Sequence, residues 1–108
     1  MESKPCFGFI TVPDIETAEK ISRELVSQRL AACVNIISGI KSIYMWEGKL
    51  CDDSETLLLV KSAFCNIDSI EKYVTSVHPY ELPEIIFTEI DGGSLPYIKW
   101  LLKSSIPV

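Results

Sequence analysis

The chain has little histidine, no excess of positive charge and no long apolar run. It contains one histidine in 108 residues, and 10 Lys and Arg against 15 Asp and Glu give a net charge of -5. A protein that binds the phosphate backbone needs a basic surface, so this balance argues against nucleic acid as a partner. No apolar run approaches the roughly 20 residues of a membrane-spanning helix, so we expect no insertion into a membrane.

Paired cysteines and a secretory signal are also lacking. The four cysteines, Cys6, Cys33, Cys51 and Cys65, include no C-x-x-C pair and no spacing typical of zinc sites. Residues 1–5 do not resemble a signal peptide. Because free thiols are typical of a reducing compartment, we expect a cytoplasmic protein. At 108 residues, it is expected to form a single domain over residues 1–108 that needs no disulfide or cofactor to fold.

The order of apolar patterns predicts strands and helices that alternate along the chain. Aromatic and β-branched runs predict strands at residues 6–12, 32–46, around 56–60 and at 84–90. Apolar residues at helical spacing predict helices at residues 15–29, 67–77 and 95–103. Asp14, Asn66 and Ser94 precede these helices and are predicted to be their N-caps. The order predicts an α+β fold, a ferredoxin-like βαββαβ sandwich with an additional C-terminal helix.

The strand predicted at residues 32–46 is too long for the helices that would cover its sheet. It spans roughly 45–50 Å at about 3.3 Å per residue, whereas a helix of about 15 residues covers roughly 22 Å. A bend is expected at Ser38-Gly39 and a hairpin turn at residues 47–49, so the extended hairpin would expose large apolar groups near its tip. Because such patches usually mark an interface, we predict an oligomer with Tyr44 and Trp46 at the contact.

The only histidine lies in a connector that also contains two prolines and two carboxylates. His78 begins the segment HPYELPE, which ends at Glu84. Each proline removes a backbone donor and biases the preceding residue toward an extended conformation, so the segment is predicted to be a rigid connector. Two interpretations remain open. Either this is a stiff loop in which His78 caps the preceding helix, or His78 and nearby oxygens or sulfurs hold a ligand, most simply a metal ion.

Three segments of the sequence resemble the CutA family of divalent-cation tolerance proteins. They are RLAACVNI at residues 29–36, SIYMWEG at residues 42–48 and HPYELPE at residues 78–84. Glu55, residues 60–62 and residues 97–100 fit the same pattern, so the resemblance covers nearly the whole chain in collinear order. It implies a single CutA-like domain in a PII-like homotrimer, whose long hairpins exchange edge pairing between subunits. It also implies a role in tolerance to copper and other divalent metals.

The resemblance and the side-chain chemistry together suggest three metal ligands. A neutral imidazole such as that of His78 binds copper or zinc. Cys33 matches the cysteine of the family and is a soft ligand for Cu(I), although its place on a strand also suits a buried structural thiol. Glu81 adds a carboxylate in the same connector as His78. This chain has Val77 and Ile10 where some relatives have a second histidine and a further cysteine.

The sequence is also compatible with other functions. The main alternative is a PII-like signalling trimer that binds a small metabolite or anion in the cleft between subunits. Lys61 and Arg29 would hold an anion if they faced that cleft, whereas Lys61 would otherwise pair with Glu55 on a neighbouring strand. A third possibility is a trimeric scaffold that presents its surface to a protein partner. Since we find no Ser-His-Asp order and no Gly-rich phosphate loop, we expect that the protein is not an enzyme.

Overall fold

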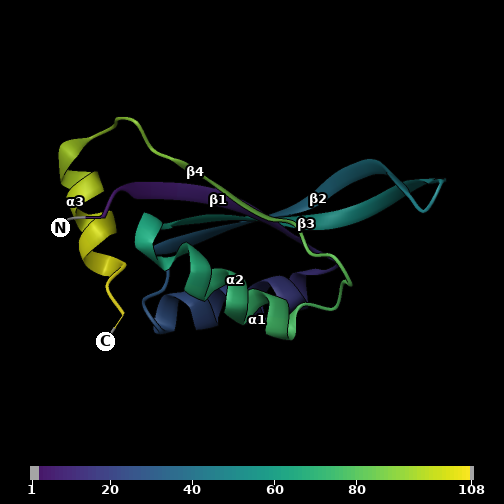
Figure 1. The fold of residues 1–108 in the computed structure, drawn as a ribbon, viewed down its shortest axis with the longest axis horizontal. Helices are drawn as coiled ribbons and strands as arrows, with labels where there is room; N and C mark the ends of the chain where they lie inside the picture. Colours follow the sequence, from purple (N-terminus) through teal and green to yellow (C-terminus); the bar gives the residue numbers. More distant parts are fainter. Residues whose placement is uncertain (1–2, 108) are drawn as a thin grey trace.

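One four-stranded antiparallel sheet organises residues 3–107, the part of the chain that the computed structural model describes (Figure 1). The elements are β1 (Pro5–Val12), α1 (Ile15–Ser27), β2 (Cys33–Trp46), β3 (Lys49–Ala63), a 3-10 turn at Phe64–Asn66, α2 (Ile67–Val77), β4 (Ile85–Glu89) and α3 (Leu95–Ser104). Met1, Glu2 and Val108, which belong to the predicted 1–108 domain, lie outside the described residues. Within residues 3–107, no helix has the length and apolar composition needed to cross a membrane.

The strand order β2-β3-β1-β4 confirms the predicted α+β, ferredoxin-like sandwich. Helices α1 and α2 cover one face of the sheet, and α3 lies at the end away from the hairpin tip (Figure 1). The core between sheet and helices contains Ile10, Val12, Leu58, Val60, Ile21, Leu25, Ile70 and Val74. The strand residues alternate in sequence, and the helix residues recur at three- and four-residue spacing, because each element buries only one of its faces.

All three predicted residues occupy the N-cap positions of their helices, but only Asp14 makes a side-chain cap hydrogen bond. Asp14 accepts a hydrogen bond from the backbone N–H of Thr17 at 2.8 Å, which lowers the pKa of the Asp14 carboxyl. The side chains of Asn66 and Ser94 make no cap hydrogen bond. Asn66 is 4% exposed, and its amide instead donates to the carbonyl oxygens of Leu30 and Ser105. Buried carbonyls need donors, and this requirement determines the orientation of the Asn66 side chain.

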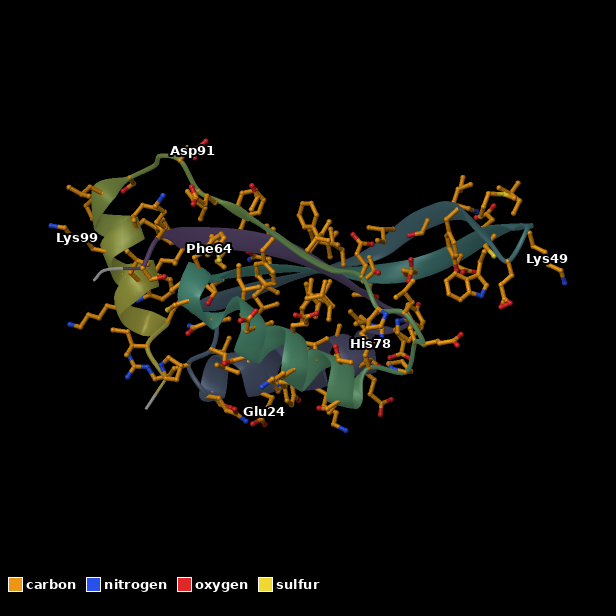
Figure 2. All side chains as sticks on the ribbon, viewed as in Figure 1. Glu24, Lys49, Phe64, His78, Asp91 and Lys99 are labelled. Atoms are coloured by element: carbon orange, nitrogen blue, oxygen red, sulfur yellow. The ribbon has the colours of Figure 1, made fainter. Side chains whose placement is uncertain are left out.

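Strands β2 and β3 continue well beyond the rest of the sheet and form an extended hairpin, as predicted. Strand β1 pairs with β3 only as far as Thr56, so residues 49–55 have β2 as their single neighbour. Figure 2 shows Lys49 at the tip, far from the helices. A register shift between Ile37 and Ile40, with Gly39 at φ +75°, confirms the predicted bend. Strand β3 is longer than the strand predicted around residues 56–60. Its polar first half, residues 49–55, is held by pairing with β2 alone.

Candidate functional site

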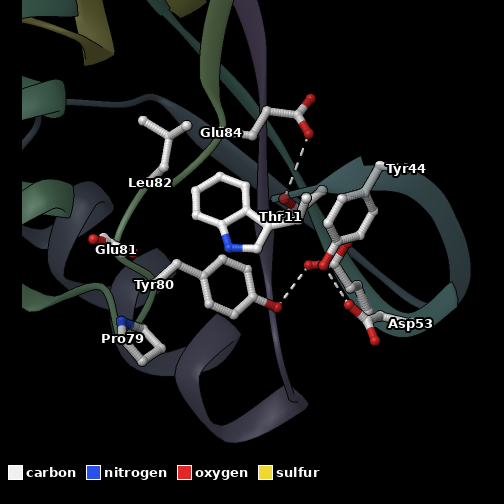
Figure 3. Close-up of a pocket in the computed structure, with 10 residues that line it drawn as sticks. Thr11, Tyr44, Asp53, Pro79, Tyr80, Glu81, Leu82 and Glu84 are labelled. Carbon is white, nitrogen blue, oxygen red and sulfur yellow. Dashed lines mark hydrogen bonds between the residues drawn. The ribbon is translucent and has the colours of Figure 1, made fainter. Parts of the chain in front are cut away.

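A cavity of about 510 Å³ lies where the hairpin leaves the sheet, beside the connector that follows α2 (Figure 3). We call it the root cavity. It is lined by Thr11, Tyr44, Trp46, Asp53, Glu55, Pro79, Tyr80, Glu81, Leu82 and Glu84. These described residues provide four carboxylates and three aromatic rings, and none of them is a lysine, arginine or histidine. A concave wall of one charge sign focuses the field, so the root cavity attracts cations and disfavours anions.

The connector is rigid for the reasons that its sequence indicates. His78 ends α2, and its N–H donates to the carbonyl of Val74 at 2.8 Å while its own backbone is extended. Pro79 then prevents the helix from continuing. The chain bends at residues 79–82 before β4 begins at Ile85. This path places Tyr80, Glu81 and Glu84 along one side of the root cavity (Figure 3).

Both ring nitrogens of His78 have partners within the chain. Nε2 lies 2.7 Å from the carbonyl oxygen of Thr11, and Nδ1 accepts a hydrogen bond from the N–H of Tyr80 at 3.1 Å. A carbonyl can only accept, so these contacts correspond to the neutral ring with its proton on Nε2. The side chain is 9% exposed. His78 therefore has two structural roles. It ends α2, and its ring connects the segment after α2 to the end of β1.

Two tyrosines of the root cavity donate to carboxylates. The hydroxyl of Tyr80 donates to Oε2 of Glu55 at 2.6 Å, and the hydroxyl of Tyr44 donates to Asp53 (Figure 3). Burial, followed by the bond to Glu55, raises the pKa of Tyr80. The bond to Asp53 is the main reason that the pKa of Tyr44 is raised to about 12. Both hydroxyls therefore keep their protons at neutral pH and remain donors.

The three predicted metal ligands do not converge in one subunit. Cys33 stands in the same row of the sheet as Lys61 and Phe7, and Thr11 lies four residues further along β1. Because a strand rises about 3.3 Å per residue, this row is roughly 13 Å from the carbonyl that holds His78. Glu81 is exposed at the edge of the root cavity. Within residues 3–107, no three His, Cys, Asp or Glu residues are grouped to hold a metal ion, so the metal role of each stays a prediction.

The expected pairing of Lys61 with Glu55 on a neighbouring strand is wrong, since both residues lie on β3. Glu55 accepts from Tyr80, whereas the Lys61 ammonium lies 5.9 Å from the centre of the Tyr97 ring. The second expected anion ligand, Arg29, donates to the carbonyl of Lys103 at 2.8 Å. The anion alternative therefore stays a prediction, and the charge of the root cavity does not favour it there.

Sequence reasoning missed Asp53 and Glu55 as residues of the site. Their two-residue spacing places both on one face of β3, and Tyr44 and Trp46 share a face of β2 in the same way. Register pairs Tyr44 with Cys51, so Asp53 is its diagonal neighbour across the hairpin. The available signal was the two-residue spacing of the acidic pair on β3 and of the aromatic pair on β2. This spacing predicts a shared site only when the pairing register of the two strands is known.

The sequence matches a known protein family and several of its members over most of its length. Residues 6–104 match the family described as CutA1 divalent ion tolerance protein. The chain is 44% identical over 96 residues to the "Divalent-cation tolerance protein CutA" of Thermus thermophilus, a match covering 89% of this chain and 93% of the relative. It is 41% identical over 97 residues to "Protein CutA 1, chloroplastic" of Oryza sativa subsp. japonica, covering 90% of this chain. The chain spans only 55% of the length of that rice protein.

A solved structure agrees with the sequence relationship. The crystal structure of CutA1 from Oryza sativa superposes on this fold with a TM-score of 0.93 at 38% identity. The match covers 97% of this chain and 96% of the rice chain. The arrangement of strands and helices is therefore shared with the rice protein.

Proposed function

Since the chain belongs to the CutA family of divalent-cation tolerance proteins, we propose that it is a homotrimer that binds copper or another divalent metal and contributes to metal tolerance. The observation that carries the metal role is the orientation of His78, whose Nε2–H is held by the carbonyl of Thr11. We assign the protein a binding role and no catalytic step. A single domain over residues 1–108 and a cytoplasmic location are part of the same proposal.

The contacts of His78 favour Nδ1 as the ligand atom. Histidines that bind metals typically donate their other ring N–H to a backbone carbonyl or carboxylate, which sets the tautomer and the ring orientation. The bond to Thr11 has this form, and it leaves the lone pair on Nδ1. A metal at Nδ1 replaces the N–H of Tyr80, which lies 3.1 Å away. Glu81 follows Tyr80 directly and supplies an oxygen ligand from the same connector.

Cys33 requires a separate role within this proposal, because its row of the sheet is distant from His78. Its side chain is partly exposed, with Sγ 4.0 Å from the amide oxygen of Asn35. A thiolate suits Cu(I), and donors from another subunit of the trimer would complete such a site. Metal binding at Nδ1 of His78 breaks the hydrogen bond that the N–H of Tyr80 donates to this nitrogen, worth about 1 kcal/mol, so we expect modest affinity for the His78 site.

Calorimetric titration of the metal-free protein with Cu²⁺ tests the metal role. Copper stands at the top of the affinity series for nitrogen and oxygen ligands, so binding is informative only when variants are compared. We expect one saturable site per chain that disappears in His78→Ala and weakens in Glu81→Gln. The control is Glu71→Gln, which removes an exposed carboxylate on α2 and should leave the titration unchanged. Equal heats in wild type and His78→Ala would contradict the proposal.

The trimer is supported by apolar surface that one chain leaves in water. Ile43, Met45 and Leu50 on the hairpin are 66%, 63% and 72% exposed. On the sheet face opposite α1 and α2, Phe9 and Ile86 are register partners that are 37% and 55% exposed. Surfaces of this kind usually bind other protein surfaces, and closed symmetry would bury them in every subunit at once.

A further inference from the structure

Glu55 is a buried carboxylate that lacks a cationic partner. Its side chain is 8% exposed, and among residues 3–107 the ion pairs are Lys4–Glu89, Arg23–Glu19 and Lys41–Asp52. The hydroxyl of Tyr80 satisfies Oε2 but brings no positive charge. Burying an ionised carboxylate is costly unless a countercharge accompanies it. Because Glu55 lines the root cavity, a cation bound there would supply this countercharge.

The walls of the root cavity suit an organic cation. Tyr44, Trp46 and Tyr80 line it together with the apolar side chain of Leu82. Aromatic faces attract ammonium groups within about 6 Å, and they also cover the alkyl segments to which such groups are attached. A strongly hydrated metal ion gains nothing from these walls, whereas an alkylammonium ion gains from both the charge and the apolar surface.

The carboxylates are dispersed around the cavity, so they suit a cation with separated charges. Figure 3 shows Glu81, Glu84 and Asp53 on different sides of Tyr80. No three acidic, histidine or cysteine side chains of the described residues converge as one metal ion requires. Each end of an extended diammonium ion, in contrast, would pair with a different carboxylate.

We propose that the root cavity binds an aliphatic diamine or polyamine in its ammonium form, with Glu55 and Glu84 as charge partners and Trp46 and Tyr80 as aromatic walls. This inference goes beyond the metal role and does not rest on it, because it uses neither His78 nor Cys33. Thr11 holds Glu84 through its hydroxyl, at 3.5 Å from Oε1, and thereby directs this carboxylate toward the end of β1. Aliphatic amines carry their protons at neutral pH because their pKa is about 10, as in lysine.

Calorimetric titration of the wild-type protein at pH 7 and fixed ionic strength tests the proposal with three ligands of similar length. We expect 1,4-diaminobutane to bind at one site per chain. Butylamine should bind at least about tenfold more weakly, because it lacks one of the two charge-assisted hydrogen bonds. The neutral 1,4-butanediol should give no saturable heat. Magnesium chloride at matched ionic strength should not displace the diamine.

Variants distinguish a built site from general attraction to an acidic protein. Glu55→Gln and Glu84→Gln should each weaken binding of 1,4-diaminobutane about tenfold or more, while Glu71→Gln, with the same change in charge, should leave it unchanged. Glu84 is exposed, so its variant remains informative if Glu55→Gln folds poorly. The absence of saturable binding to the wild type, as when a neighbouring subunit fills the cavity, would overturn the proposal. Equal weakening by Glu84→Gln and Glu71→Gln would overturn it as well.

Discussion

Single polar side chains join parts of this chain that are distant in sequence. The ring of His78 bonds the carbonyl of Thr11, and the amide of Asn66 bonds carbonyls before β2 and after α3. All these bonds are buried, where an unpaired polar group is costly. The same rule explains why the Asn66 side chain bonds distant carbonyls and makes no cap hydrogen bond at the start of α2. At this scale, burial determines what a polar side chain does more than its sequence neighbours do.

Asn66→Ala should destabilise the protein by about 1–3 kcal/mol, because the carbonyls of Leu30 and Ser105 would lose a buried donor. Denaturation by urea at constant protein concentration measures the change as a lower midpoint with an unchanged slope. Gln28→Ala removes an exposed amide and should change stability by less than about 0.5 kcal/mol. A midpoint for Asn66→Ala equal to that of the wild type would show that these bonds contribute nothing to stability.

Residue type alone identified part of the candidate site. His78 and Glu81 were found because an imidazole and a carboxylate in a proline-rich connector are unusual. The partners of the two ring nitrogens were not predictable, because they depend on how the connector meets the end of β1. Glu55 was predicted only as a family match and as a partner of Lys61, because its actual partner, Tyr80, is 25 residues away in sequence.

At the scale of elements, existence and order were predictable and ends were not. Helix α1 ends at Ser27, and Arg29, the predicted end, has a left-handed φ of 59° in the turn toward β2. Strand β3 begins at Lys49, well before the apolar run that predicted it. Its first half is mostly polar, with Asp52, Asp53 and Glu55, and it is stabilised by pairing with β2. This nonlocal interaction cannot be predicted from the apolar residues of the segment itself.

The hairpin provides the most direct test of assembly. We expect Trp46→Ala to weaken the trimer, because losing a large aromatic side chain from a packed contact costs roughly 3–5 kcal/mol. Light scattering on dilution should give three times the chain mass of 12.1 kDa for the wild type and a lower mass for the variant. Trp46 also lines the root cavity, so the mass is measured without added amine.

Val26→Ala is the matched control for the hairpin variant. Val26 is 41% exposed on α1, away from the hairpin, and its truncation should leave the mass unchanged at every concentration. A Trp46→Ala protein that keeps the wild-type mass on dilution would remove Trp46 from the contact. A wild-type protein with the mass of one chain would contradict the trimer itself.

At the scale of the whole molecule, the sheet has one covered face and one open face. Helices α1 and α2 bury one face, while the open face carries Phe9 and Ile86 and continues into the hairpin. The root cavity lies where the hairpin leaves the sheet, beside the connector with His78, and Tyr44 and Trp46 of the hairpin line it. The proposed surfaces for assembly and for cation binding are therefore neighbours, and a ligand at the hairpin root would lie close to any contact made by the hairpin.

Long-range proton–nitrogen NMR of the ¹⁵N-labelled protein during a Zn²⁺ titration tests the central claim, that Nδ1 of His78 is a metal ligand. The chain has one histidine, so the imidazole signals belong to His78 without ambiguity. We predict that the metal-free ring carries its proton on Nε2, and that zinc shifts the Nδ1 signal while Nε2 remains protonated. Ring signals that stay unchanged at saturating zinc would contradict the claim.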